Sequence, residues 1–249
     1  MRPLVFVFIL ASQFSYGQDA LDIINRYIDT VSNGDVRNWN SIKSVYSESE
    51  SYYGQQAFDQ KVDLLKKDKP NFQRSYRVPP YDHRIELYED STFTKLLSTF
   101  YYLKDRNILL IGNIPPIIKE AGKRDEFFSD YPPVYIWKLV DKSKSMELLG
   151  IKQFPVDGLS CYEIKVSTKG RDYFFYIDTK SFLLNYWSIN GEGDRSSLFK
   201  FYNYKSLDDF LIPMSESSMR NGTIFYWNNI KKIVLNSKID PKLFQYEDK

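Results

Sequence analysis

The sequence predicts an α+β protein that is mainly β, with a large antiparallel sheet accompanied by a few helices. From Met146 to Phe244 the chain is a series of β-rich runs separated by turn residues, which is the pattern of neighbouring antiparallel strands. An amphipathic helical pattern precedes the strands near the N-terminus. Aromatic residues make up 17% of the chain, with 20 Tyr and 18 Phe, and these side chains bury large areas. The composition therefore indicates a wide β interior or an aromatic-lined cavity.

The first 17 residues have the pattern of a secretory signal peptide. Arg2 gives a positive start, residues 4–10 form an apolar run, and the small residues Ser15 and Gly17 precede a predicted cleavage site near Gln18. The apolar run is far shorter than the roughly 20 residues that span a bilayer. We therefore expect an exported mature chain that is soluble. A retained, uncleaved anchor is the alternative.

A helix is predicted directly after the leader, with Asp19 as a possible N-cap and Asn33-Gly34 as its end. Its apolar residues recur at three- and four-residue intervals and share one face: Leu21, Ile24, Tyr27, Ile28 and Val31. A single helix before a β domain must bury that face. The open concave side of a curved sheet is the expected place.

Strands are predicted through the first half of the chain at residues 44–53, 71–78, 84–88 and 92–103. Residues 54–69 fit either a continued strand or a short helix. Between Gly112 and Ser145 the pattern becomes helical, and we predict two short helices there. Ile114-Pro-Pro-Ile117 opens the first, which Gly122 ends, and Tyr131-Pro-Pro133 opens the second.

About six strands are predicted in the second half, at the roughly 8–12-residue spacing of an all-β sheet or barrel. In the run Tyr173-Phe-Phe-Tyr176, Tyr173 and Phe175 share one face while Phe174 and Tyr176 share the other. Both faces are therefore aromatic. Either the sheet is covered on both sides, or one face lines a ligand cavity.

The composition excludes several kinds of site. With 34 basic and 32 acidic residues and no basic cluster among aromatics, we expect no nucleic-acid partner. His83 is the single histidine, which excludes metal sites built from paired histidines; its polar surroundings indicate a solvated loop residue. Cys161 is the single cysteine and is interpreted as a small buried apolar residue. No catalytic residue, metal ligand or cofactor is predicted, although a carboxylate pair of a hydrolase would leave no sequence signal.

Several short motifs resemble the outer-membrane lipoprotein-sorting family, the LolA/LolB-type periplasmic carriers and their uncharacterised relatives. The matching residues, in order, are Glu147-Leu-Leu-Gly150, Val156-Asp-Gly158 with Tyr162, Tyr176-Ile-Asp-Thr-Lys180, Leu211-Ile-Pro213 and Ile239-Asp-Pro-Lys-Leu-Phe244. Their order and spacing over about a hundred residues carry the resemblance. It implies that residues 18–249 form a single LolA/LolB-like domain, a strongly curved antiparallel sheet or incomplete barrel with helices plugging its concave face.

The resemblance also implies a non-catalytic, monomeric protein that holds acyl chains in an apolar cavity. Its partners would be lipid or the acyl chains of lipoproteins, together with outer-membrane components. It would be located in the periplasm, either free or associated with the inner face of the outer membrane. The segment Ile114–Val140 would be either a lid over the cavity or a core-packing connector. The candidate ligand-binding residues are Ile24, Ile28, Trp137, Phe174, Tyr176 and Trp187. The alternatives are a structural protein of the cell envelope with a filled core and, third, a secreted hydrolase using Asp or Glu.

Overall fold

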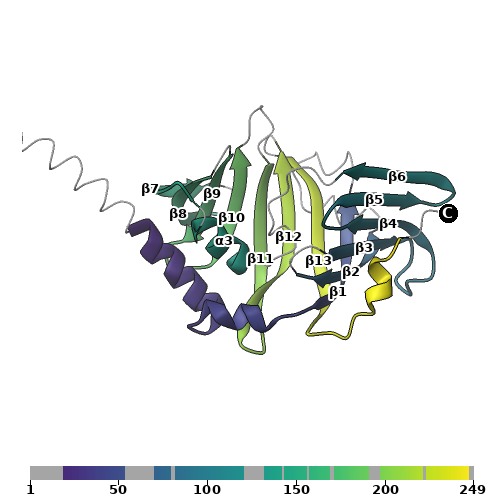
Figure 1. Ribbon diagram of the computed structural model, residues 1–249. Coiled ribbons are helices and arrows are strands. Elements are labelled where there is room, and N and C mark those ends of the chain that lie inside the picture. The colour runs from purple at the N-terminus through teal and green to yellow at the C-terminus, as the bar shows by residue number, and fades with distance from the viewer. Residues whose placement is uncertain are drawn as a thin grey trace, which may run out of the picture.

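The computed structural model describes residues 19–53, 70–79, 82–120, 132–141, 143–155, 157–168, 171–190, 197–220 and 223–246. Within these ranges, 13 strands form one sheet in the order β6-β5-β4-β3-β2-β1-β13-β12-β11-β10-β9-β8-β7 (Figure 1). The strands are β1 (Val45–Tyr53), β2 (Asn71–Val78), β3 (Asp82–Tyr88), β4 (Leu96–Tyr102), β5 (Arg106–Ile111), β6 (Ile114–Glu120), β7 (Ser145–Phe154), β8 (Leu159–Thr168), β9 (Arg171–Asp178), β10 (Leu184–Asn190), β11 (Ser197–Leu207), β12 (Phe210–Arg220) and β13 (Thr223–Leu235).

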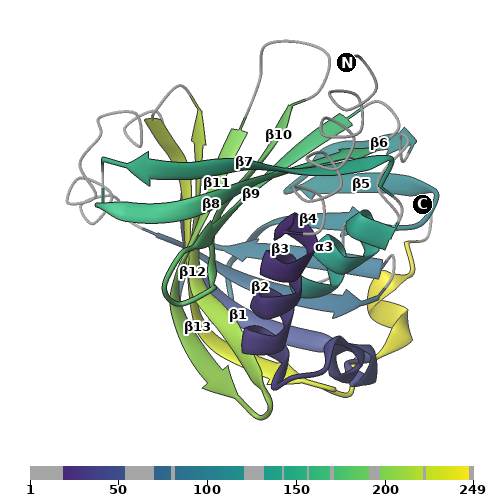
Figure 2. The ribbon, with the colours of Figure 1, turned by 90° about the vertical axis from the view of Figure 1, so that its left-hand side faces the viewer.

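Strand β1 lies in the middle of the sheet, between β2 and β13, and both pairings are antiparallel. From β1 the chain runs strand by strand to the edge at β6, then continues in β7 at the opposite edge and returns to the middle with β13. The two edge strands are not paired with each other, so the sheet curls without closing (Figure 2). The predicted fold class, a curved antiparallel sheet in an incomplete barrel, is confirmed.

The described residues of the second half form seven strands, β7 to β13, where about six were predicted. Only Asp208 and Asp209 separate β11 from β12. Phe210 and Ile212 extend β12 by packing into an apolar cluster with Trp39. Tertiary burial therefore decided where this strand begins.

Four short helices accompany the sheet in the described part of the chain: residues 19–32, the 3-10 helix η1 (Val36–Ser41), α3 (Pro132–Asp141) and the 3-10 helix η3 (Pro241–Phe244). The first ends where predicted, since Asn33 and Gly34 take positive φ angles of 50° and 82°. The Gly34 N–H donates to the Asp29 carbonyl at 3.0 Å. None of the helices in the described ranges is long and apolar enough to cross a membrane.

The helix predicted at residues 114–122 is wrong, because Ile114–Glu120 forms the edge strand β6. It pairs with β5 through a tight turn in which Gly112 has a φ of 47°. The register shifts between the pairs Leu109–Ile117 and Ile111–Ile114, so the irregularity falls where the two prolines stand. Proline is tolerated at a sheet edge or bulge because it donates no ladder hydrogen bond. The second predicted helix, opening at the next proline pair, is confirmed as α3.

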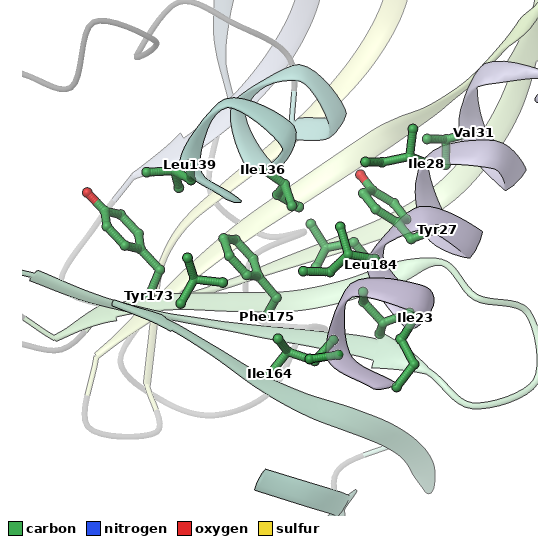
Figure 3. Packing of buried hydrophobic residues seen from close by; sticks show 14 of the residues in the cluster. Ile23, Tyr27, Ile28, Val31, Ile136, Leu139, Ile164, Tyr173, Phe175 and Leu184 are labelled. Carbon is green, nitrogen blue, oxygen red and sulfur yellow. The ribbon is translucent and has the colours of Figure 1, made fainter. Parts of the chain in front are cut away.

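The main apolar core lies between the concave face of the sheet and two helices, residues 19–32 and α3 (Figures 2 and 3). Ile136 and Leu139 come from α3, and Ile164 and Phe175 come from β8 and β9. Helix 19–32 contributes Ala20, Ile23, Ile24, Tyr27, Ile28 and Val31. The prediction that this helix docks on a curved sheet is confirmed.

Candidate ligand-binding site

The predicted ligand-binding residues do not all lie on one face of the sheet. Ile24 and Ile28 are 1% and 4% exposed in the core under helix 19–32, and Trp187 of β10 packs against the same cluster. Trp187 also stacks on Phe199 of the next strand, with ring centroids 4.8 Å apart. These three residues come together on the concave face. Trp137 belongs to α3, but its side chain lies outside the described part of the structure.

Phe174 and Tyr176 lie on the opposite, convex face of β9. They pack with Cys161, Tyr186 and Phe154, while Tyr173 and Phe175 pack into the core under the helices. The predicted two-sided aromatic pattern of this strand is therefore observed. Because a sheet separates the two groups, one cavity on the concave face can include Ile24, Ile28 and Trp187 but not Phe174 and Tyr176.

The convex face of β8 to β11 carries paired charges. The Lys200 Nζ lies 2.6 Å from a carboxylate oxygen of Asp157, and the Tyr186 hydroxyl donates to the same carboxylate at 2.5 Å. Burial raises the pKa of Asp157, but hydrogen bonds from Lys200 and Tyr186 outweigh it, so the pKa lies below its usual value. Burial and the bond to Asp157 raise the pKa of Tyr186. The carboxyl is thus held ionised and cannot serve as a general acid near neutral pH.

The other half of the concave face is polar and contains a cavity of about 120 Å³. Its lining comes from β1, β2, β3, β11, β12 and β13 and includes Gln73, Ser75, Arg77, His83, Glu216 and Asn228. A row of directly paired residues, Phe201–Glu216–Asn228–Ser51, crosses four strands from the apolar core into this region. Paired residues in an antiparallel ladder share a face. The cavity therefore opens on the same side of the sheet as the helices.

His83 is not the solvated loop residue that was predicted. It lies in β3, is 4% exposed, and its Nε2 is 2.8 Å from the Ser75 hydroxyl and 3.4 Å from the Arg77 Nε. Two prolines and several polar residues near His83 gave the impression of a loop. The strand begins just after the prolines, and its pairing with β2 places the histidine on the concave face.

Cys161 was correctly interpreted as buried. It is 0% exposed, and burial raises the pKa of its thiol to about 11. A thiol with so high a pKa is a weak nucleophile at neutral pH because the thiolate is the reactive form. In the described ranges, no group of three or more His, Cys, Asp or Glu side chains is placed to hold a metal ion.

The sequence interpretation missed the polar cavity. One local signal was present: in β1, the residues that alternate with Tyr46, Glu48 and Glu50 are Val45, Ser47, Ser49 and Ser51. Ser49 and Ser51 are buried, so this face of the strand is small and polar where a packed core would be apolar. The remaining lining residues are brought together by pairing between strands far apart in the sequence.

Comparison with known proteins shows the fold but no close relative. No family model and no curated protein matches the sequence. One similar structure is a domain from Vibrio parahaemolyticus that is named as an outer membrane lipoprotein-sorting protein domain. It is 10% identical over 92% of this chain and 97% of its own, with a TM-score of 0.57. A LolA superfamily protein from Nitrosomonas europaea is 9% identical over 91% of this chain and 97% of its own, with a TM-score of 0.54.

A DUF1329 family protein from Desulfovibrio piger is also similar, with 12% identity over 93% of this chain and 98% of its own and a TM-score of 0.59. In each case the likeness extends over nearly the whole length of both chains. It covers the open curved sheet together with the elements that lie on it. This chain therefore has a LolA-like fold.

Proposed function

We propose that this protein is an exported, non-catalytic carrier that holds lipid, or the acyl chains of a lipoprotein, between its curved sheet and the helices on the concave face. The main support for the proposal is the apolar layer between strands β8 to β10 and the two helices above them, residues 19–32 and α3 (Figure 3). Two of the similar structures are named for lipoprotein sorting or for the LolA superfamily. This supports a periplasmic carrier, with residues 1–17, outside the described ranges, as its signal peptide.

Binding would require the helix to move. Tyr27 and Ile28 lie over Phe175 and Leu184 (Figure 3), and Ile24 belongs to the same packed cluster. An acyl chain would replace these contacts. The helix would have to shift outward and remain over the acyl chain, so that the apolar faces of helix and sheet both stay out of water and the burial of the acyl chain itself is the net gain. A ligand that binds only the open form shifts the population toward that form. The residues proposed to contact the chain are Ile24, Ile28 and Trp187.

The alternative is a structural protein of the cell envelope with a filled core. The burial of helix 19–32 favours it, since side chains occupy the layer in the form described here. The two proposals differ in whether the layer opens for a ligand.

A fluorescent fatty acid tests the carrier proposal. Each buried methylene contributes about 0.8 kcal/mol, so about ten of them give a micromolar Kd. Trp187→Ala should weaken binding several-fold, because Trp187 borders the apolar layer. Tyr176→Phe is the matched control: it also changes a buried aromatic residue, but on the convex face, and binding should be unchanged. Absence of probe binding to the wild-type protein would reject the carrier and favour the structural protein.

Export has its own test. The mature chain should begin at or near Gln18 and appear in the periplasmic fraction. N-terminal sequencing that returned Met1 from membrane pellets would contradict export, and the carrier would then have no access to periplasmic cargo.

A further inference from the structure

The polar cavity on the concave face has the features of a head-group site. We infer that it binds the zwitterionic, phosphate- and ammonium-containing head of a phospholipid whose acyl chain lies under helix 19–32. This inference rests on the proposed function and specifies its ligand: a carrier of bare acyl chains would need only the apolar layer. Three observations support it, namely the contact between the cavity and the apolar core, the donors at one end and the acceptors at the other.

The cavity adjoins the apolar core directly. Phe201 is 7% exposed, belongs to the core cluster under the helices, and also lines the cavity. A chain lying on one side of Phe201 and a head on the other would form one amphiphile. At roughly 30 Å³ per water molecule, 120 Å³ corresponds to about four waters or a small polar head. It is too small for a second acyl chain.

Hydrogen-bond donors gather at the end formed by β2 and β3. Arg77 is paired with His83 across the two strands, and the Ser75 hydroxyl lies 2.8 Å from the His83 ring. All three line the cavity. A guanidinium presents several N–H groups in a plane that matches phosphate oxygens. The Arg77 Nε donates to the His83 Nε2 at 3.4 Å, and this bond helps to orient the guanidinium. This end suits a phosphate.

Acceptors gather at the end formed by β12 and β13. The Asn228 amide nitrogen donates to Glu216 Oε1 at 3.3 Å, and the Tyr226 hydroxyl donates to the same oxygen at 3.5 Å. These two donors orient the carboxylate without exhausting its capacity, since a carboxylate accepts about four hydrogen bonds. Asn228 is buried and is held in turn by the Ser51 hydroxyl at 3.0 Å. This end suits an ammonium group.

The charged side chains that line the polar cavity favour one class of lipid head group over the others. Arg77 and Glu216 give the lining one positive and one negative side chain, so a head that carries only a phosphate would face an uncompensated carboxylate. An uncharged glycerol head would form no charged pair with either side chain. A zwitterion pairs with both, and complementary charge is the usual source of such specificity.

Three lipids with the same myristoyl chain test the inference by displacing a fluorescent fatty acid from the full mature protein. Lysophosphatidylethanolamine should displace the probe at a concentration at least about tenfold below lysophosphatidylglycerol and monoacylglycerol, because it alone pairs with both Arg77 and Glu216; tenfold is about 1.4 kcal/mol. Equal displacement by all three would overturn the inference and leave a water-filled cavity. A preference for lysophosphatidylglycerol would overturn it too, because the acceptor end would then play no part.

Variants of Glu216 and Arg77 test which end of the polar cavity binds the ammonium group and which binds the phosphate. Glu216→Gln should bring lysophosphatidylethanolamine and lysophosphatidylglycerol within about threefold of each other. Arg77→Gln should do the same for lysophosphatidylethanolamine and monoacylglycerol, and Arg77→Lys, which keeps the charge, should retain part of the preference even if Arg77→Gln does not fold. Glu50→Gln is the matched control, because Glu50 is a carboxylate of β1 that pairs with Lys231 and does not line the cavity. A change of preference in Glu50→Gln equal to that in Glu216→Gln would overturn the assignment.

The experiments distinguish a failure of the carrier proposal from a failure of the head-group inference. If the fatty-acid probe and all three lipids fail to bind, the carrier proposal fails, and glycerophosphoethanolamine without a chain tests the cavity alone by calorimetry. Heat of binding that is lost in both Glu216→Gln and Arg77→Gln supports a head-group site without a carrier. No heat from the wild-type protein rejects the head-group site as well. If the probe binds but the head groups are not distinguished, only the head-group inference fails.

Discussion

The two halves of the concave face are built from the same kind of antiparallel ladder but are filled in opposite ways. Over β8 to β10 the face carries Ile164, Phe175 and Leu184, and helices cover it with apolar side chains. Over β1 to β3 and β12 to β13 it carries Ser51, Gln73 and other polar side chains around a cavity. Close packing makes the first half stable and unable to admit ligand without movement, whereas the second half is already open to a small polar group.

The apolar half should respond most strongly to truncation. Ile24→Ala removes buried methyl groups from a filled layer and should lower the free energy of unfolding by about 2–5 kcal/mol. Chemical denaturation of the mature protein measures this. Leu96→Ala is the control, because Leu96 is 50% exposed and its loss should cost less than about 0.5 kcal/mol. An unchanged stability in Ile24→Ala would mean that the helix is not docked, and the contrast between the halves would disappear.

Much of the apolar half was predictable from local patterns. The three- and four-residue spacing of helix 19–32 identified its buried face, and alternation in β9 separated Tyr173 and Phe175 from Phe174 and Tyr176. Alternation gives two faces but does not say which is concave. The candidate residues were therefore drawn from both sides of the sheet.

The polar half and the sheet edge were not predictable in the same way. The cavity joins β2 and β3 to β12 and β13, which are more than a hundred residues apart and meet only because β1 pairs with both sides. His83 looked like a loop residue because prolines precede it, yet strand pairing buried it. The prolines of β6 resembled a helix start because local sequence does not reveal that a strand is at an edge, where proline is tolerated.

The convex face under the apolar half should show a pH-dependent contribution. Asp157 has a lowered pKa in the folded protein, so the unfolded chain binds more protons as the pH falls through the window below about 4. The stabilisation by Asp157 is present above the unfolded pKa and is lost as the pH falls through the folded pKa. Asp157→Asn should cost about 1–3 kcal/mol at pH 7, and the difference from wild type should shrink on acidification. If the difference in the free energy of unfolding between Asp157→Asn and wild type stayed the same from neutral to acidic pH, the ion pair with Lys200 would not stabilise the fold.

The polar half should tolerate truncation better than the apolar half. Asn228→Ala removes the donor to Glu216 and the acceptor for Ser51, but water in the adjoining cavity can replace both groups. We expect a loss of about 1 kcal/mol, smaller than for Ile24→Ala, measured by the same denaturation. A loss as large as that of Ile24→Ala would mean that this half is closed to water, and a head group could not enter it without the kind of rearrangement required on the other side.

The smallest effect is expected at Cys161, on the convex face, opposite the proposed binding site. With a pKa of about 11, only about one thiol in a thousand is ionised at pH 8, and the side chain is fully buried. Labelling with a thiol reagent should therefore be slow in the native protein and fast in denaturant. Cys161→Ser combined with Ser206→Cys is the control, because residue 206 is exposed and should label at once. Because the sheet separates Cys161 from the helices, a fatty acid that opens the concave layer should not speed its labelling; acceleration would show that ligand entry opens β8 and β9 themselves.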